Sequence, residues 1–212
     1  MRGDRAPEAP PALFDVVREE LCGFTVIRPR DWEQLRHEYG EAGMAAPYWA
    51  TAWPSGLTLA EAVADRSLGG RRVLELGCGL SVPSLAAAAA GGRVLATDGS
   101  ADAVAFAAHN LALNELEGEV AVVDWREPEA LVEGGPWDLV LAADVLYLRH
   151  NVEALLRLLP KLLVPGGEAI LADPRRAGGR DFVASAKRIF SLESRRDRER
   201  PSVDVHTLRL PR

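Results

Sequence analysis

The sequence has few cysteines: Cys22 and Cys78 are the only two among 212 residues. Two cysteines are too few for a metal cluster, and they lack the dense, even spacing of a secreted disulfide framework. No run reaches the roughly 18 consecutive apolar residues of a membrane-spanning helix, and the opening stretch MRGDRAPEAPPALFD lacks the apolar core of a signal peptide. We therefore expect a cytoplasmic protein that is neither exported nor embedded in a membrane.

Basic residues are outnumbered, since 25 Lys and Arg stand against 31 Asp and Glu, for a net charge of -6. This balance argues against broad electrostatic attachment to nucleic acid and favours a cationic partner. The one strongly basic stretch, RRDRER at 195–200, is interleaved with acids and is typical of a solvated strand end and loop. We expect no nucleic-acid partner.

Motifs for metal and serine chemistry are missing. The four histidines, His37, His109, His150 and His206, are dispersed, and the sequence has neither H-E-x-x-H nor G-x-S-x-G. We expect each histidine to be an ordinary surface or packing residue, and no metal in the functional site.

Apolar strands alternate with helical stretches from residue 71 onward. Strands are predicted at 71–76, 92–98, 118–124, 137–144 and 167–173, with helices near 82–90, 101–114, 127–133 and 150–163. Such alternation predicts a parallel sheet covered on both faces. After a helix near 180–189, the segments 190–196 and 203–210 are separated only by a polar loop, which predicts a terminal antiparallel pair. The expected fold is α/β and Rossmann-like, with seven mostly parallel strands and an antiparallel C-terminal strand.

The N-terminal part is expected to be a small extension of this domain. Residues 1–12 are rich in Pro and Ala and predict a flexible tail. A short helix is predicted at 13–21, a strand at 24–29, and a helix begun by Asp31 and stopped by Gly40. We expect residues 13–56 to form a cap and substrate-side segment, and 57–212 to form the main domain.

A glycine turn follows the first strand of the main domain, in VLELGCGLSVPSLAAA at 73–88. A strand, a tight turn and a helix N-terminus in this order bind dinucleotides, nucleotides or S-adenosylmethionine. A dinucleotide-binding turn requires a small residue at the position that Val82 occupies, and Glu75 would repel a pyrophosphate. Both observations argue against a dinucleotide. S-adenosylmethionine carries an ammonium and a sulfonium that Glu75 would attract, and a carboxylate for the backbone N–H groups of Gly77, Cys78 and Gly79.

Acids also end the next two strands. Asp98, followed by Gly99, stands about 20 residues past the glycines, where a carboxylate accepts hydrogen bonds from ribose hydroxyls. The alternative is that Asp98 caps the helix near 101, for which Ser100 is an equal candidate. Asp124 and Trp125 are predicted to recognise adenine, the acid by accepting from its amino group and the indole by packing on its ring. The alternative makes them a turn residue and an edge-packing residue.

Together these stretches resemble the class I, seven-strand, S-adenosylmethionine-dependent methyltransferases from residue 71 to the C-terminus. LELGCGLSVPSLAAA, LATDGS and VVDW are similar to the three successive cofactor motifs of that family. PYWATAWPSGLTLAEAV and AADVLY resemble the subfamily that contains protein lysine methyltransferases. PYWA, WPSG and ADPRR are most similar to the enzymes that act on lysines of the electron-transfer flavoprotein beta subunit. Arg175 departs from that pattern, because a D-P-G-R-like loop has glycine there.

The resemblance implies roles for further residues. Trp53 aligns with the subfamily's tryptophan and, with Ala143, would wall the cofactor site. Asp144 and Tyr147 fill its D-x-x-Y motif and are the expected catalytic residues: Asp144 would bind the substrate ammonium, and Tyr147 would pack on the lysine stem or hydrogen-bond the nitrogen. The alternative is that Asp144 caps the helix that begins after Arg149 and that Tyr147 fills a groove in the core.

The sequence therefore predicts a monomeric S-adenosylmethionine-dependent N-methyltransferase that acts on lysine side chains of a protein substrate. One alternative is a methyltransferase for a small, nicotinamide-like amine, an activity that the subfamily also includes. A second is a non-catalytic S-adenosylmethionine-binding module. An open rim would suit a protein lysine, whereas a closed lid built from 13–48 would suit a small molecule.

Overall fold

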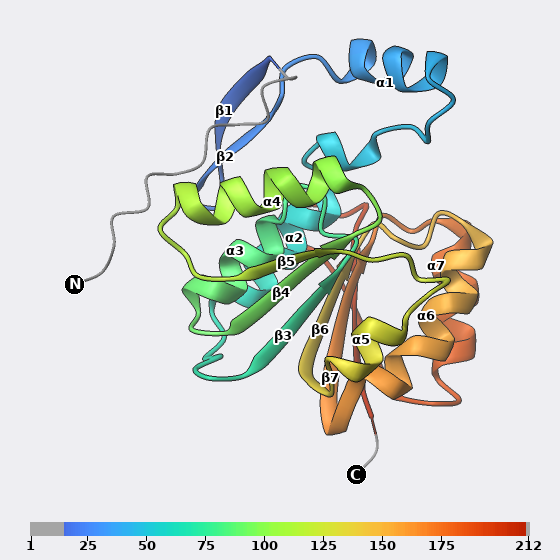
Figure 1. Ribbon diagram of the computed structural model, residues 1–212. Coiled ribbons are helices and arrows are strands. Elements are labelled where there is room, and N and C mark those ends of the chain that lie inside the picture. Colours follow the sequence, from blue (N-terminus) through green and yellow to red (C-terminus); the bar gives the residue numbers. More distant parts are fainter. Residues whose placement is uncertain (1–14, 211–212) are drawn as a thin grey trace.

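Seven strands form the central sheet of the computed structural model, which describes residues 15–210 (Figure 1). In chain order they are β3 (Arg72–Leu76), β4 (Arg93–Asp98), β5 (Glu119–Val122), β6 (Trp137–Ala143), β7 (Leu163–Asp173), β8 (Ser191–Arg196) and β9 (Asp204–Arg209). Their order across the sheet is β5-β4-β3-β6-β7-β9-β8. The chain thus builds outward from β3 on one side and then resumes at β6 on the other.

The strand directions confirm the predicted sheet. Strands β3 to β7 are parallel to one another, and β9 lies antiparallel between β7 and β8. The last strand of the chain therefore occupies an interior position, and β8 forms the edge.

Helices cover both faces of the sheet, as predicted. The first face carries α2 (Pro54–Ala64), α3 (Val82–Ala89) and α4 (Ala101–Leu113), and the second carries α5 (Glu129–Glu133), α6 (Arg149–Leu162) and α7 (Ala177–Ala186) (Figure 1). Alternate strand residues divide between the faces: Val73 packs in the first core, and Leu74 packs in the second. Two-sided burial explains why these strands have nearly continuous apolar sequences.

The N-terminal extension begins with a hairpin of β1 (Val16–Leu21) and β2 (Phe24–Pro29). The prediction of a helix at 13–21 was wrong over its described part. Val16 and Val17 are β-branched, which favours a strand, and Cys22 and Gly23 form a two-residue turn with φ of 51° and 82°. The predicted strand at 24–29 is confirmed, whereas the predicted tail at 1–12 lies outside the described residues.

The helix predicted from Asp31 is confirmed as α1 (Trp32–Glu41). The Asp31 side chain accepts a hydrogen bond from the backbone N–H of Gln34, as an N-cap does. The helix runs one residue past Gly40. A short 3-10 helix, η1 (Tyr48–Ala50), then leads into α2.

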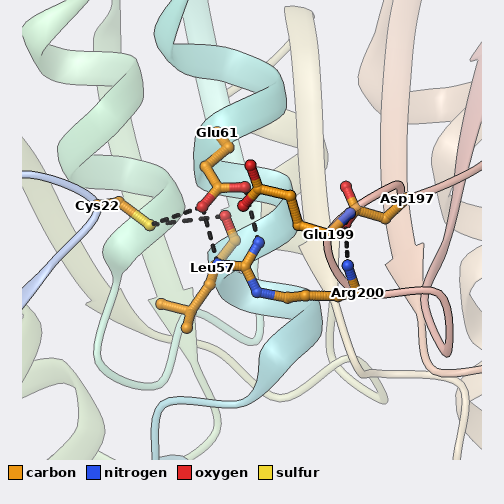
Figure 2. Close-up of polar contacts among 6 residues, drawn as sticks. All are labelled: Cys22, Leu57, Glu61, Asp197, Glu199 and Arg200. Carbon is orange, nitrogen blue, oxygen red and sulfur yellow. Dashed lines mark hydrogen bonds and ion pairs between the residues drawn. The ribbon is translucent and has the colours of Figure 1, made fainter.

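A polar contact joins the hairpin, α2 and the loop between β8 and β9 (Figure 2). Both terminal nitrogens of Arg200 bond the carboxylate of Glu61, at 2.7 and 2.8 Å, and the Cys22 thiol lies 3.9 Å from the same carboxylate. Arg200 belongs to the basic stretch that was expected to be solvated. For Arg200 this expectation was wrong, because its side chain is only 24% exposed.

Across residues 15–210, no helix combines the length and the apolar character that crossing a bilayer requires.

Candidate active site

A cavity of about 910 Å³ opens beyond the carboxyl ends of β3, β4 and β6. Parallel α/β sheets bind ligands where the strand order reverses, which here is between β3 and β6. All twelve predicted site residues line this cavity: Trp53, Glu75, Gly77, Cys78, Gly79, Asp98, Gly99, Asp124, Trp125, Ala143, Asp144 and Tyr147. The fold thus gathers residues from five separate segments of the chain at one place.

The glycine turn needs its two glycines for different reasons. Both take left-handed backbone angles, with φ of 70° at Gly77 and 49° at Gly79. A Cβ on Gly77 would lie 2.9 Å from the side chain of Val145, and a Cβ on Gly79 would lie 3.2 Å from the carbonyl oxygen of Trp49. The Cys78 side chain packs instead in a small core cluster, where burial raises the pKa of its thiol. Cys78 therefore shapes the turn without offering a reactive thiolate.

Glu75 is buried at the end of β3. One carboxyl oxygen, Oε2, accepts hydrogen bonds from the backbone N–H of Ser84, at 3.0 Å, and from the Ser84 hydroxyl. Burial raises the pKa of Glu75 to about 8, although the Ser84 hydrogen bonds oppose this rise. Among residues 15–210, nothing donates to the other oxygen. That oxygen remains available to a cation in the cavity.

Asp98 fastens the glycine turn to the end of β4. Its Oδ2 accepts from the backbone N–H of Gly79 at 3.0 Å, and its Oδ1 accepts from the backbone N–H of Ser100 at 2.9 Å. Burial raises its pKa. The helix cap of α4 is Ser100, whose hydroxyl accepts from the Ala103 N–H. The capping role is thus assigned to Ser100, and Asp98 keeps a lone pair on each oxygen for a ligand.

Asp124 and Trp125 stand on the far side of the turn. The Asp124 carboxylate is paired with the Arg126 guanidinium, which lowers the pKa of Asp124 to about 2. Trp125 is half-buried and flanks the glycine turn, because a Cβ on Gly77 would lie 3.8 Å from its ring. Sequence reasoning did not anticipate the pairing of Asp124 with Arg126.

Asp144 follows β6 with a left-handed φ of 54°. Its backbone N–H donates to the carbonyl of Ala172 at 2.9 Å, and its side chain is 8% exposed. The alternative in which it caps α6 does not hold, because the N-cap residue is Leu148 and no side chain caps that helix end. Tyr147 is 44% exposed, so it does not fill a core groove either.

Aromatic rings surround the cavity mouth above Asp144. The rings of Tyr48 and Tyr147 meet edge to face with centroids 5.8 Å apart, and the centroids of Tyr48 and Trp53 lie 6.3 Å apart. The indole N–H of Trp53 donates to the carbonyl of Tyr48 at 2.7 Å, which orients the Trp53 ring. The segment after α1 therefore contributes one wall of the mouth.

Sequence reasoning missed a residue outside the cavity that bonds Asp144. Arg176, the N-cap residue of α7, donates from its Nε to Asp144 Oδ1 at 2.6 Å, and from its backbone N–H to Asp173 Oδ2 at 2.8 Å. Asp173 is buried, and burial raises its pKa to about 6. The signal was present in ADPRR, but of its two arginines only Arg175 had been singled out. Arg175 takes the left-handed φ of 62° that suits a glycine.

The cavity fits S-adenosylmethionine. The two glycines permit the left-handed turn without contact of a Cβ with Val145 or Trp49. Sequence reasoning assigned the N–H groups of this turn to a ligand carboxylate, but the Cys78 N–H donates to the carbonyl of Thr97 at 2.9 Å and the Gly79 N–H donates to Asp98 at 3.0 Å, so these two are already engaged. Glu75 presents an oxygen that suits a cationic group, Asp98 presents acceptor oxygens that suit ribose hydroxyls, and Trp125 offers an aromatic surface. The two acids and the indole ring match the ammonium, ribose and adenine parts of that cofactor.

Comparison with known proteins supports the same class. Residues 31–189 match the lysine methyltransferase family. Protein N-lysine methyltransferase METTL21A of Danio rerio is 32% identical over 197 residues, which cover 89% of this chain and 84% of the relative. Electron transfer flavoprotein beta subunit lysine methyltransferase of Xenopus laevis is 34% identical over 163 residues, which cover 74% of this chain but 60% of the relative.

A solved structure shares the fold. The 16S rRNA methyltransferase of T. thermophilus in complex with AdoMet and guanosine aligns with a TM-score of 0.70 at 19% identity, over 95% of this chain and 52% of that one. At this identity the likeness concerns the fold alone. Taken with the family match, the twelve residues gathered at the switch point lead to one conclusion: the chain belongs to the lysine methyltransferase family and is an S-adenosylmethionine-dependent methyltransferase.

Proposed function

We propose that this protein methylates lysine side chains of a protein substrate. One arrangement carries the proposal: the buried carboxylate of Asp144 lies in a cavity whose mouth holds the half-exposed rings of Tyr48 and Tyr147. A lysine side chain combines an apolar stem with a cationic end. Aromatic faces bind both parts, and a carboxylate binds the ammonium.

Each part of the cavity has a task in this reaction. S-adenosylmethionine, when bound, supplies a methyl group that is transferred to the lone pair of a nitrogen. Such a transfer mainly requires that the acceptor nitrogen be aligned with that methyl group, at roughly 3 Å, and the cavity residues would provide this alignment. Asp144 and Tyr147 would hold the acceptor. Glu75, the glycine turn and Asp98 would hold the amino acid and ribose parts of the cofactor, and Asp124 with Trp125 would hold its adenine.

The open mouth favours a protein over a small molecule. Met44, between α1 and η1, and Tyr48, the first residue of η1, are 53% and 46% exposed, so these residues wall the cavity without closing over it. An exposed apolar rim suits a lysine presented on a macromolecular surface. The names of the Danio and Xenopus relatives also describe lysine methyltransferases, one of them acting on a flavoprotein subunit.

We further propose that the protein acts as a monomer in the cytoplasm, with no nucleic-acid partner. The net charge of -6 supports the exclusion of nucleic acid, and the free thiols of Cys22 and Cys78 support the reducing cytoplasm. Light scattering of the purified chain, at several concentrations, tests the monomer. Retention on immobilised RNA at physiological salt would contradict the exclusion of nucleic acid.

The decisive experiment supplies isotope-labelled S-adenosylmethionine and cell extract to the wild type, to Asp144→Asn and to the matched control Asp181→Asn. Asp181 is an exposed acid on α7, away from the cavity. We expect label on protein lysines, identified by mass spectrometry, with the wild type and the control but not with Asp144→Asn. Label confined to small molecules would indicate the small-amine alternative. Cofactor binding without any labelled product would indicate the non-catalytic module.

A further inference from the structure

Arg176 connects the ends of two neighbouring strands. Ala143 of β6 pairs with Ala172 of β7, so the acids that follow them, Asp144 and Asp173, lie side by side. Arg176 bonds both, through its side chain to the first and through its backbone to the second. Only the side-chain bond depends on the residue being arginine, so a substitution there leaves the backbone bond to Asp173 available.

The Arg176 side chain orients Asp144 without entering the cavity. Within the described residues, Asp144 and Tyr147 line the cavity, and Arg176 does not. Arg176 donates a hydrogen bond to Asp144 Oδ1, and no group in residues 15–210 donates one to Oδ2. Its guanidinium carbon also lies 5.8 Å from the centroid of the Tyr147 ring. One side chain thus contacts both residues of the acceptor site from outside it.

The cavity that Arg176 borders is rich in acids. Its acidic side chains are Glu75, Asp98, Asp102, Asp124 and Asp144. The basic side chains are Arg126, which is bonded to Asp124, together with Arg157 and His150. Its neutral titratable groups are the thiol of Cys78 and the phenols of Tyr39, Tyr48 and Tyr147. In such surroundings an unpaired Asp144 would keep an incoming amine in its ammonium form.

An ammonium has no lone pair and cannot accept a methyl group, so tight binding of the charged form would oppose the reaction. We propose that Arg176 is a positioning residue: it holds one oxygen of Asp144 and, by offsetting its charge, favours the unprotonated form of the acceptor amine at the transfer position. The proposal rests on the proposed function, since it assumes an amine acceptor at Asp144. The amine proton passes to water at the open mouth.

Cofactor analogues test this role without the unknown acceptor. S-adenosylmethionine carries a positive charge at the transfer position, whereas S-adenosylhomocysteine carries none there. Calorimetry on the full chain gives both affinities for the wild type, Arg176→Gln, Arg176→Lys and the control Arg175→Gln. Arg175 neighbours Arg176, is exposed and makes no side-chain bond within residues 15–210, so its variant matches the change in net charge.

We expect Arg176→Gln to raise the affinity of S-adenosylmethionine relative to S-adenosylhomocysteine by about fivefold, because one positive charge near the site is lost. Arg176→Lys and Arg175→Gln should leave the ratio unchanged. An unchanged ratio in folded Arg176→Gln, or equal losses for both ligands, would overturn the proposal in favour of a purely structural role. A shift of the same size in Arg175→Gln would also overturn it.

Sinefungin provides a second readout, because it carries a primary amine at the transfer position. Its affinity measured against pH reports the pKa of that amine when bound. We expect this pKa to rise by about one unit in Arg176→Gln relative to the wild type. Coincident pH profiles would overturn the proposal. The extract-labelling experiment tests the lysine acceptor separately, so its failure is distinguishable from a failure here.

Discussion

The amide of Asn110, on α4, hydrogen-bonds both backbone groups of Ile27 in the N-terminal hairpin. Its Oδ1 accepts from the Ile27 N–H at 2.8 Å, and its Nδ2 donates to the carbonyls of Ile27, at 3.3 Å, and of Leu80, at 3.1 Å. Leu80 belongs to the segment that follows the glycine turn. One buried side chain therefore satisfies both Ile27 groups on the free edge of β2 and ties this strand to the loop after the glycine turn.

Asn110→Ala should lower the free energy of unfolding by about 3 kcal/mol, because it leaves three buried backbone groups without their partner. Asn114→Ala is the comparison, since Asn114 bonds Thr25 of the same strand from a partly exposed position. We expect it to cost about 1 kcal/mol, because water can replace those bonds. Urea unfolding gives both values, and equal losses would contradict the role of burial.

Glu75→Gln should change how stability depends on pH. Glu75 has a pKa of about 8 in the fold against 4.5 ordinarily, so the folded state binds more protons than the unfolded chain between these values. Its burial therefore destabilises the protein increasingly as pH rises through this window. The variant lacks this penalty. Without cofactor, its free energy of unfolding should therefore exceed that of the wild type by a margin that grows to roughly a few kcal/mol at about pH 8. Parallel stability curves from urea unfolding across this range would refute the assignment.

Asp98→Ala should weaken S-adenosylmethionine binding by about tenfold or more, because both the ribose acceptor and the bond to the Gly79 N–H are lost. Asp98→Asn keeps one acceptor oxygen and should lose less. Calorimetric titration measures both variants. Wild-type affinity in a folded Asp98→Ala protein would remove Asp98 from the cofactor site.

Arg175→Gly should stabilise the protein by about 1 kcal/mol, because a side chain is disfavoured at the left-handed φ of 62°. Arg175→Ala removes every side-chain atom beyond the Cβ but keeps the Cβ that the left-handed backbone disfavours, so it serves as the control and should leave stability nearly unchanged. Thermal unfolding distinguishes the two variants. A glycine variant no more stable than the alanine variant would show that the loop is unstrained.

The pair of Arg200 and Glu61 should contribute about 0.5 to 1 kcal/mol, as partly exposed ion pairs do. A double-mutant cycle with Arg200→Gln and Glu61→Gln isolates this coupling energy. Added salt should reduce the coupling by screening. A coupling that is absent at low salt would show that the contact only fixes geometry.

The sheet and its site were predictable because they depend on local patterns. The strands at 72–76 and 93–98 are buried on both faces, so their apolar runs identify them, and the acids that end them must meet at one edge. The hairpin was missed because Val16 and Val17 also suit the apolar positions of a short helix. The turn at Cys22 and Gly23 decides between the two, and Cys is not a usual turn residue.

Two side-chain pairings could not be predicted from the sequence, for different reasons. The pairing of Arg126 with Asp124 is local, but many arginines follow acids without bonding them, so the sequence alone does not predict it. The bond from Arg176 to Asp144 requires that β6 and β7 be neighbours and that α7 begin beside Asp144. The parallel alignment of β6 and β7 sets these conditions, and no short motif encodes it.

The interior position of β9 determines when the sheet can be completed during synthesis. While the ribosome synthesises the chain, the outer edge of β7 has no permanent partner until residues 204–209 have emerged. Strand β8 is made earlier, but it joins the sheet only through β9. Until then, the edge of β7 exposes unpaired backbone groups with which another nascent chain can pair. Completion of the sheet therefore depends on its last strand to be translated.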